Sequence, residues 1–152
     1  MTGTMRVLHF VGFVAWLGGG LGAMVAGIVL RRLDRSLWGG VADVQAALYR
    51  ILIGPGSMLT VVSGFALTMQ HYGTMSLSVG PWLGMMQLCG ICGAIATLLG
   101  AMPAAMRLGR LEPTGPTAAA FDVARGRLIR FGIIGGVFST LALLAGALYR
   151  VA

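Results

Sequence analysis

The fold of this chain is set by residues 8–20, which read Leu8-His9-Phe10-Val11-Gly12-Phe13-Val14-Ala15-Trp16-Leu17-Gly18-Gly19-Gly20. They belong to an apolar run, residues 7–30, in which His9 is the only ionisable side chain. About 20 apolar residues, each adding about 1.5 Å of rise, are enough for a helix to cross the hydrocarbon core of a bilayer. We therefore expect residues 7–30 to form a transmembrane helix.

One face of this helix carries residues that contact with lipid alone would not require. Residues three or four apart share a side of a helix, and on this side they are His9, Gly12, Trp16, Gly19, Ala23 and Gly27. The face thus combines a titratable ring, an aromatic ring and a row of small residues. Small residues let a neighbouring backbone or a flat ring approach closely. We expect this face to meet other helices or a planar cofactor.

The composition is typical of a small membrane protein. The chain has 152 residues, of which 57% are hydrophobic and only 10% are charged, and its mean hydropathy is +0.89. Its formal net charge is +7, and all of its cationic side chains are arginines. They lie almost wholly in the expected loops rather than on one solvated face, which argues against nucleic-acid binding. We predict a single all-α domain, an integral membrane four-helix antiparallel bundle.

Three further apolar runs predict the remaining membrane spans, at about residues 50–70, 82–106 and 128–149. Pro55 removes a backbone donor near the start of the second span, so it should kink or reset the first helical turns. Residues 41–48 are mildly amphipathic. They form either a short interfacial helix or the entry into the second span.

The arginines predict the orientation of the bundle. Apart from Arg6 and Arg150, all of them lie in or beside two connectors, residues 31–49 and residues 107–127. Loops rich in Arg and Lys remain on the cytoplasmic side of a membrane. We therefore expect both termini on the outer, periplasmic side of a bacterial inner membrane.

The second and third spans also carry rows of small or polar residues at helical spacing. In the second span these are Ser57, Thr60, Gly64, Thr68 and His71, and in the third they are Met86, Gly90, Gly93, Thr97 and Gly100. Hydroxyl groups in lipid usually bond to their own helix or to a neighbouring one. Both rows therefore favour helix packing.

Three side chains that can bind metal fall in the same half of the expected bundle. His9 lies near the outer end of the first span, His71 at the outer end of the second, and Met86 near the outer end of the third. An ionisable residue inside a membrane indicates a functional site by default. The alternatives are a structural role for His9, a solvated loop position for His71 and gap filling in the core for Met86.

Several of these residues together resemble the HemJ/CopD-like superfamily of small bacterial membrane bundles. They are Leu8-His9 with Trp16 further along the helix, Leu48-Tyr49-Arg50-Ile51 and Pro55 around the start of the second span, and Trp82 at the start of the third. The resemblance covers the first three helices. Within the superfamily the chain is most similar to an uncharacterised family of four-helix integral membrane proteins.

The resemblance implies a b-type haem near the outer face, with His9 as an iron ligand. The HemJ pattern has a lysine in the third helix where this chain has Met86, which counts against protoporphyrinogen oxidase activity. Methionine is an accepted partner of histidine on haem iron, so we predict that His9 and Met86 bind the metal and that His71 is the competing ligand. The predicted cofactor-binding residues are His9, Met86, His71, Trp16, Gly12 and Gly90.

The leading functional hypothesis is therefore a haem-binding electron carrier or sensor, and two others stay open. The chain could be a Cu(I)-binding or transport module of CopD type, because thioether sulfur suits soft metals and methionines gather in the outer half. It could also be an accessory subunit without a cofactor, whose glycine-rich faces dock other membrane subunits or a second copy. The predicted spans contain no carboxylate, which argues against acid and base catalysis there.

Overall fold

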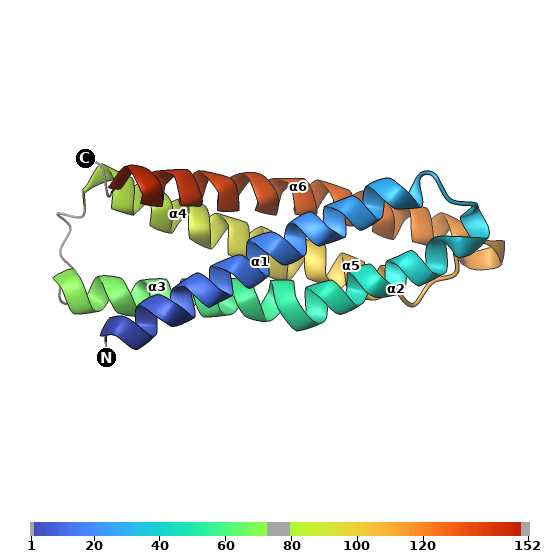
Figure 1. Ribbon diagram of the computed structural model, residues 1–152. Helices are drawn as coiled ribbons and strands as arrows, with labels where there is room; N and C mark the ends of the chain where they lie inside the picture. The colour runs from blue at the N-terminus through green and yellow to red at the C-terminus, as the bar shows by residue number, and fades with distance from the viewer. Residues whose placement is uncertain (1, 73–79, 150–152) are drawn as a thin grey trace.

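The computed structural model describes the backbone of residues 2–72 and 80–149, and the side chains of residues 3–70 and 80–149. Within these ranges every regular element is a helix (Figure 1). In chain order the elements are α1 (Thr2–Leu30), η1 (Arg35–Leu37), α2 (Trp38–Leu48), η2 (Tyr49–Ile53), α3 (Gly54–Tyr72), α4 (Pro81–Ile95), η3 (Ala96–Ala101), α5 (Met102–Leu108), η4 (Gly115–Thr117) and α6 (Ala118–Tyr149).

These elements join into four long rods, and each is long and apolar enough to cross a membrane. The four membrane-length segments are Gly3–Leu30, Arg35–Gln70, Pro81–Leu108 and Gly115–Tyr149. Both chain ends lie at the same end of the molecule (Figure 1). We call the opposite end, which carries Arg31, Arg32, Arg35 and Arg110, the arginine-rich end. The prediction of an all-helical chain with four membrane-length helices is confirmed.

Helical structure extends further toward the arginine-rich end than hydropathy predicts. The second and fourth rods are already helical before residues 50 and 128, because α2 and the first turns of α6 belong to them. Both segments are amphipathic, and they bury Ala42 on α2 and Phe121 on α6 completely. Burial of one face stabilises a helix whose other face is polar. The expected long connectors are therefore short turns.

Two rods contain π-helical turns, and each turn lies just before a proline. The segment η2 precedes Pro55, and the Gly54 N–H donates to the carbonyl of Tyr49, five residues earlier. In the same way η3 precedes Pro103, and the Met102 N–H donates to the carbonyl of Thr97. A π-turn is one way to satisfy backbone groups beside a proline without a sharp break. The expected resetting of the helix near Pro55 takes this form.

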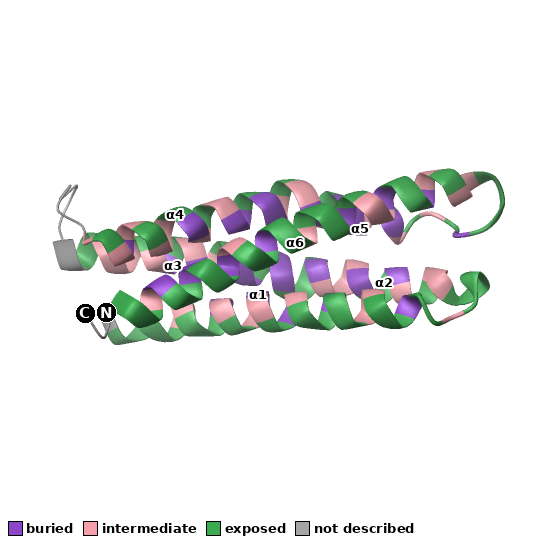
Figure 2. Cartoon of the chain, turned by 90° about the horizontal axis from the view of Figure 1, so that it is seen from above, coloured by how far each residue is buried: buried purple, intermediate pink, exposed green. Residues whose placement is uncertain are grey.

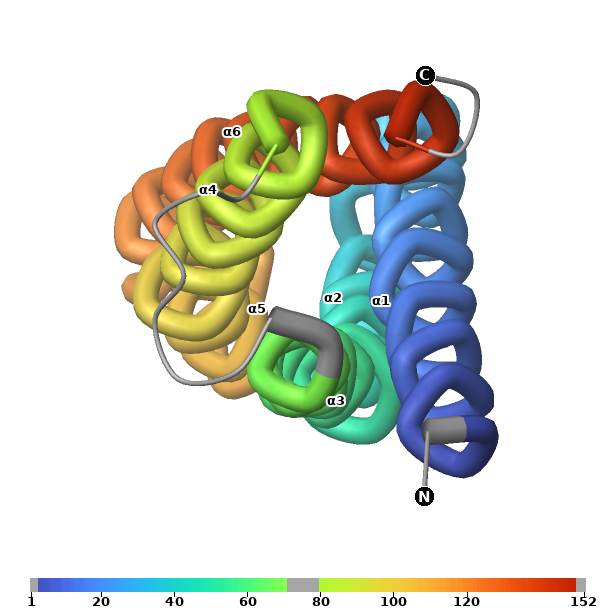
Figure 3. The backbone as a smooth tube through the Cα atoms, turned by 90° about the vertical axis from the view of Figure 1, so that its left-hand side faces the viewer, coloured from blue at the N-terminus to red at the C-terminus, as the bar shows by residue number. Residues whose placement is uncertain are grey.

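Glycines bring the rods together in two close pairs. α1 packs along α3, where a Cβ on Gly12 would lie 2.9 Å from the carbonyl oxygen of Gly56. α4 and η3 pack along α6, where a Cβ on Gly135 would lie 2.8 Å from Thr97 Oγ1 of η3. Figure 3 shows the two pairs end-on, with α1 beside α3 and α4 beside α6.

Contacts at the arginine-rich end tie the two pairs together. Arg35 forms an ion pair of 2.8 Å with Asp122 and donates from Nε to the carbonyl of Pro113 at 2.7 Å. The ring of Trp38 lies under the guanidinium groups of Arg35 and Arg125, which are 5.2 and 4.8 Å from its centroid. This cluster joins the start of α2 to the start of α6.

The outer surface of the bundle is apolar. Large hydrophobic side chains point away from the molecule along every rod, including Phe10, which is 71% exposed, and Leu99, which is 76% exposed. Exposed and buried residues alternate along the rods, and buried positions concentrate between them (Figure 2). An apolar exterior around small, closely packed residues is the pattern of a helical membrane protein.

Candidate functional site

His9 lies between α1 and α3 and is held by the backbone of α3. Its Nδ1 is 2.8 Å from the carbonyl oxygen of Thr60 and 3.2 Å from Ser63 Oγ. The ring packs so closely on Gly64 that a Cβ there would lie 2.9 Å from His9 Cε1. The His9 side chain therefore points to a neighbouring helix, as the face of α1 predicts.

The contact with Thr60 decides which nitrogen of His9 carries the proton. A carbonyl oxygen can only accept, so Nδ1 must donate its hydrogen. In a neutral imidazole Nε2 is then the unprotonated nitrogen, which is the form that binds metals. Nε2 has no hydrogen-bond partner among residues 3–70 and 80–149. The structure thus fixes the direction of the His9 ring and the tautomer of its neutral form.

Met86 lies at about the same depth in the bundle as His9 but contacts a different helix. Its Sδ would be 2.9 Å from a Cβ on Gly146, so the thioether packs on α6. Trp16 on α1 contacts Gly93 on α4 and Thr97 on η3. His9 lies two helical turns before Trp16, and Met86 lies two helical turns before Gly93, so the two residues lie at a similar depth. The sequence predicts this similar depth. However, His9 contacts α3, whereas Met86 contacts α6.

Gly12 and Trp16 both take part in helix packing. Gly12 packs directly on the α3 backbone at Gly56 and Thr60. Trp16 is 3% exposed and donates from Nε1 to Thr97 Oγ1 at 3.2 Å. Both belong to the inward face of α1, which the spacing of residues correctly predicts.

The structure shows no contact between Gly90 and His9 and does not describe the side chain of His71. A Cβ on Gly90 would meet no atom within 4 Å, so this position borders open space. His71 lies in the last turn of α3, but its side chain lies outside the described residues. Among the described residues there is no cluster of three or more His, Cys, Asp or Glu side chains that could hold a metal ion.

No family model, no curated protein and no solved structure matches the chain.

A cleft that the sequence did not predict runs between α1 and α6, and we call it the lateral cleft. It has a volume of about 650 Å³. One wall runs along α1 from Trp16 and ends at Arg31, the residue after this helix. The other wall is the part of α6 from Arg125 to Leu141, and Tyr49 belongs to the floor. α1 packs mainly on α3, and α6 packs mainly on α4 and η3, so these two helices leave space between them.

The floor of the lateral cleft holds polar groups that are satisfied inside the protein. Gln45 donates from Nε2 to the carbonyl of Ala23 at 2.8 Å, and Thr97 accepts the Trp16 indole N–H. The sequence predicts residues 41–48 to be either an interfacial helix or the entry into the second span, and the structure shows that they are the entry into this span. Ala42, Gln45 and Tyr49 are buried in it, and their helical spacing is the signal that indicates this buried face.

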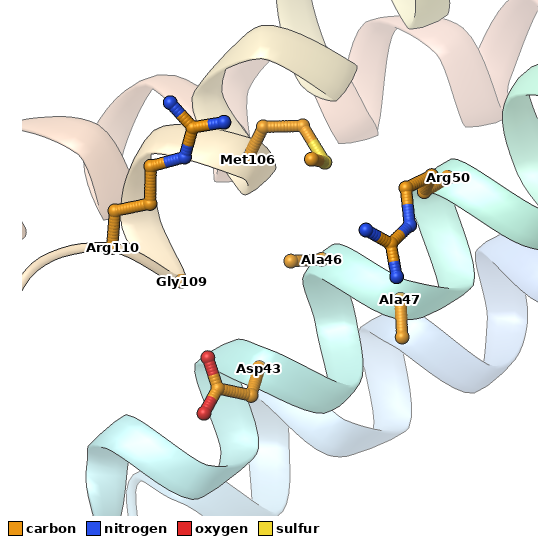
Figure 4. Close-up of a pocket in the computed structure, with 7 residues that line it drawn as sticks. All are labelled: Asp43, Ala46, Ala47, Arg50, Met106, Gly109 and Arg110. Atoms are coloured by element: carbon orange, nitrogen blue, oxygen red, sulfur yellow. The ribbon is translucent and has the colours of Figure 1, made fainter.

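A smaller pocket of about 300 Å³ lies at the arginine-rich end between α2 and α5. Figure 4 shows its charged groups, Asp43 on α2, Arg50 on η2 and Arg110 after α5. Its remaining lining is formed by Ala46, Ala47, Met106 and Gly109. All three charged residues are exposed, and such mixed charges are typical of a solvated surface, so we assign no ligand to this pocket.

Proposed function

We propose that this chain is a multi-pass membrane protein that binds a b-type haem through Nε2 of His9. The site would lie in the half of the bundle that holds the chain termini. From the distribution of arginines we further propose that this half faces the periplasm of a bacterial inner membrane. The haem would supply one-electron redox chemistry, which suits an electron carrier or a sensor.

The observation that carries this proposal is the hydrogen bond from His9 Nδ1 to the carbonyl of Thr60. Histidines that bind metals usually donate their other ring N–H to a carbonyl or carboxylate, which fixes the tautomer and the direction of the ring. Ser63 supports the same nitrogen. Nε2 of His9 is left without a hydrogen-bond partner among the described residues, so it is available to a ligand.

The second axial ligand is a separate question. Met86 packs against Gly146 on α6, which favours a packing role for its thioether in this arrangement. His71 belongs to the last turn of α3, the helix that holds His9. His71 and Met86 are therefore both tested below as the partner of His9.

Absorption spectra of detergent-purified protein, oxidised and then reduced with dithionite, test the proposal. We expect a Soret band in the wild type and its loss in His9→Gln, because glutamine can still donate to the carbonyl of Thr60 but does not replace imidazole on iron. Whichever of His71→Ala and Met86→Leu shifts the reduced spectrum identifies the second ligand. Gln70→Ala, an exposed position near the same end, is the control.

Two results would contradict haem binding by His9. One is a wild-type protein that stays colourless after incubation with haemin, and the other is an unchanged Soret band in His9→Gln. Copper in the purified protein, measured by mass spectrometry without haem, would instead support the Cu(I)-binding module. A metal-free protein that purifies with stoichiometric membrane subunits would support the accessory-subunit hypothesis.

A further inference from the structure

The lateral cleft has the length and the walls of a lipid-binding site. It follows α1 from Trp16 to Arg31, a distance of about 22 Å along the helix axis, whereas one leaflet contributes about 15 Å of hydrocarbon. Its volume of about 650 Å³ lies within the range of about 300–1,000 Å³ that is usual for sites that hold small molecules. A single acyl chain therefore fits its length and volume.

Glycines keep the cleft open. Gly20 on α1 and Gly136 on α6 both line it, and a Cβ at either position would meet no atom within 4 Å. Leu21, Met24 and Ile133 add apolar side chains that are exposed. The walls thus have room for hydrocarbon and present apolar surface to it.

One end of the cleft is cationic, and the protein does not neutralise this charge. Arg31 and Arg125 both line the cleft, and they are close enough for their charges to interact. Arg31 is exposed and has no ion-pair partner among the described residues. Asp122, which also interacts with Arg125, is held by Arg35 at 2.8 Å. A negatively charged group of a bound molecule would neutralise the positive charge at this end of the cleft.

We propose that the lateral cleft binds one anionic phospholipid, with an acyl chain along the cleft and the phosphate at Arg31 and Arg125. The long apolar walls account for the chain, and the two arginines account for the charge. Basic pockets between transmembrane helices are a recognised way to bind anionic headgroups. This site is separate from His9, so the spectra of His9 variants do not bear on it.

Native mass spectrometry of delipidated protein in detergent, titrated with phosphatidylglycerol or phosphatidylcholine, tests the proposal. We expect one tightly bound phosphatidylglycerol per chain and weaker binding of phosphatidylcholine. Arg31→Gln should weaken phosphatidylglycerol binding about fivefold, and Arg31→Gln with Arg125→Gln about thirtyfold, because each arginine contributes a similar favourable charge interaction. Arg32→Gln is the matched control, since Arg32 is exposed but does not line the cleft.

A second set of variants tests the position of the acyl chain. Gly20→Leu and Gly136→Leu place a side chain in the open space of the cleft, so they should reduce the binding of both lipids more than tenfold. Gly18→Leu is the control, because a Cβ at Gly18 also meets no atom within 4 Å, but Gly18 does not line the cleft. Circular dichroism and size-exclusion chromatography confirm that each variant is folded.

Three outcomes would overturn the proposal. Equal affinity for both lipids, with no effect of Arg31→Gln, would exclude a charge-selective site. Unchanged phosphatidylglycerol binding in the folded Gly20→Leu and Gly136→Leu proteins would place the lipid elsewhere. A wild-type dimer that Gly20→Leu dissociates would show that a second copy of the chain fills the cleft.

Discussion

Replacement of Trp16 by alanine should lower the free energy of unfolding by about 3 kcal/mol, the low end of the range for loss of a buried tryptophan. Trp16 is buried, and its ring lies against Gly93, where a Cβ would be 3.2 Å from Trp16 Cη2. Trp16 therefore packs α1 against the other helix pair in the middle of the bundle. The cavity left by alanine would lie between the two pairs, so we expect a large effect.

Trp16→Phe separates packing from hydrogen bonding at the same position. Phenylalanine retains an aromatic ring but loses the bond to Thr97 Oγ1, and hydrogen bonds between transmembrane helices contribute about 0.6 kcal/mol on average. Unfolding in mixed micelles with sodium dodecyl sulfate, followed by circular dichroism, measures both variants. Phe10→Ala is the control for loss of an exposed aromatic ring on α1. Equal losses in Trp16→Ala and Trp16→Phe would contradict a packing role.

Gly12→Ala should destabilise the bundle by about 2 kcal/mol, whereas the same substitution at Gly18 should be neutral or stabilising. An added Cβ at Gly12 would lie 2.9 Å from the Gly56 carbonyl oxygen and from the Thr60 amide nitrogen. Backbone atoms cannot move aside as the end of a side chain can, and overpacking of this kind costs about 1–3 kcal/mol. Gly18 has open space instead, and alanine favours a helix by about 1 kcal/mol over glycine.

Gly12→Ala should also disturb His9, the proposed haem ligand. His9 lies one turn before Gly12 and bonds to Thr60, the residue that an added Cβ would push away. We therefore expect Gly12→Ala to weaken or shift any Soret band as well as to lower the unfolding midpoint, both measured on the same preparation. Opposite signs of the stability change at Gly12 and Gly18 are the decisive result. A stable Gly12→Ala protein would contradict the close contact of α1 with α3.

The inward face of α1 could be predicted because helical periodicity fixes which residues share a side. Gly12, Trp16 and Ala23 are buried as that spacing requires. Periodicity does not say which neighbour that side meets. For this reason the equal depth of His9 and Met86 follows from the sequence, whereas their contacts with α3 and α6 do not.

The helical ends near the arginines could not be predicted from hydropathy. Asp43 and Asp122 lower the hydropathy of their segments, yet each lies on the polar side of a helix whose other side is buried. Burial of Phe121 depends on α2 and α6 meeting, which is a contact between distant parts of the chain. The lateral cleft likewise depends on the separation of α1 from α6, and no local pattern encodes that distance.

The opening between α1 and α6 also determines how a guest molecule could be exchanged. Leu21, Met24 and Ile133 beside it are exposed on the flank of the bundle rather than at an aqueous end. A molecule there would enter and leave within the plane of the bilayer, without passing through water. Its occupancy would follow its mole fraction among the surrounding lipids, so buffer washes would leave it in place and dilution into fresh detergent would remove it.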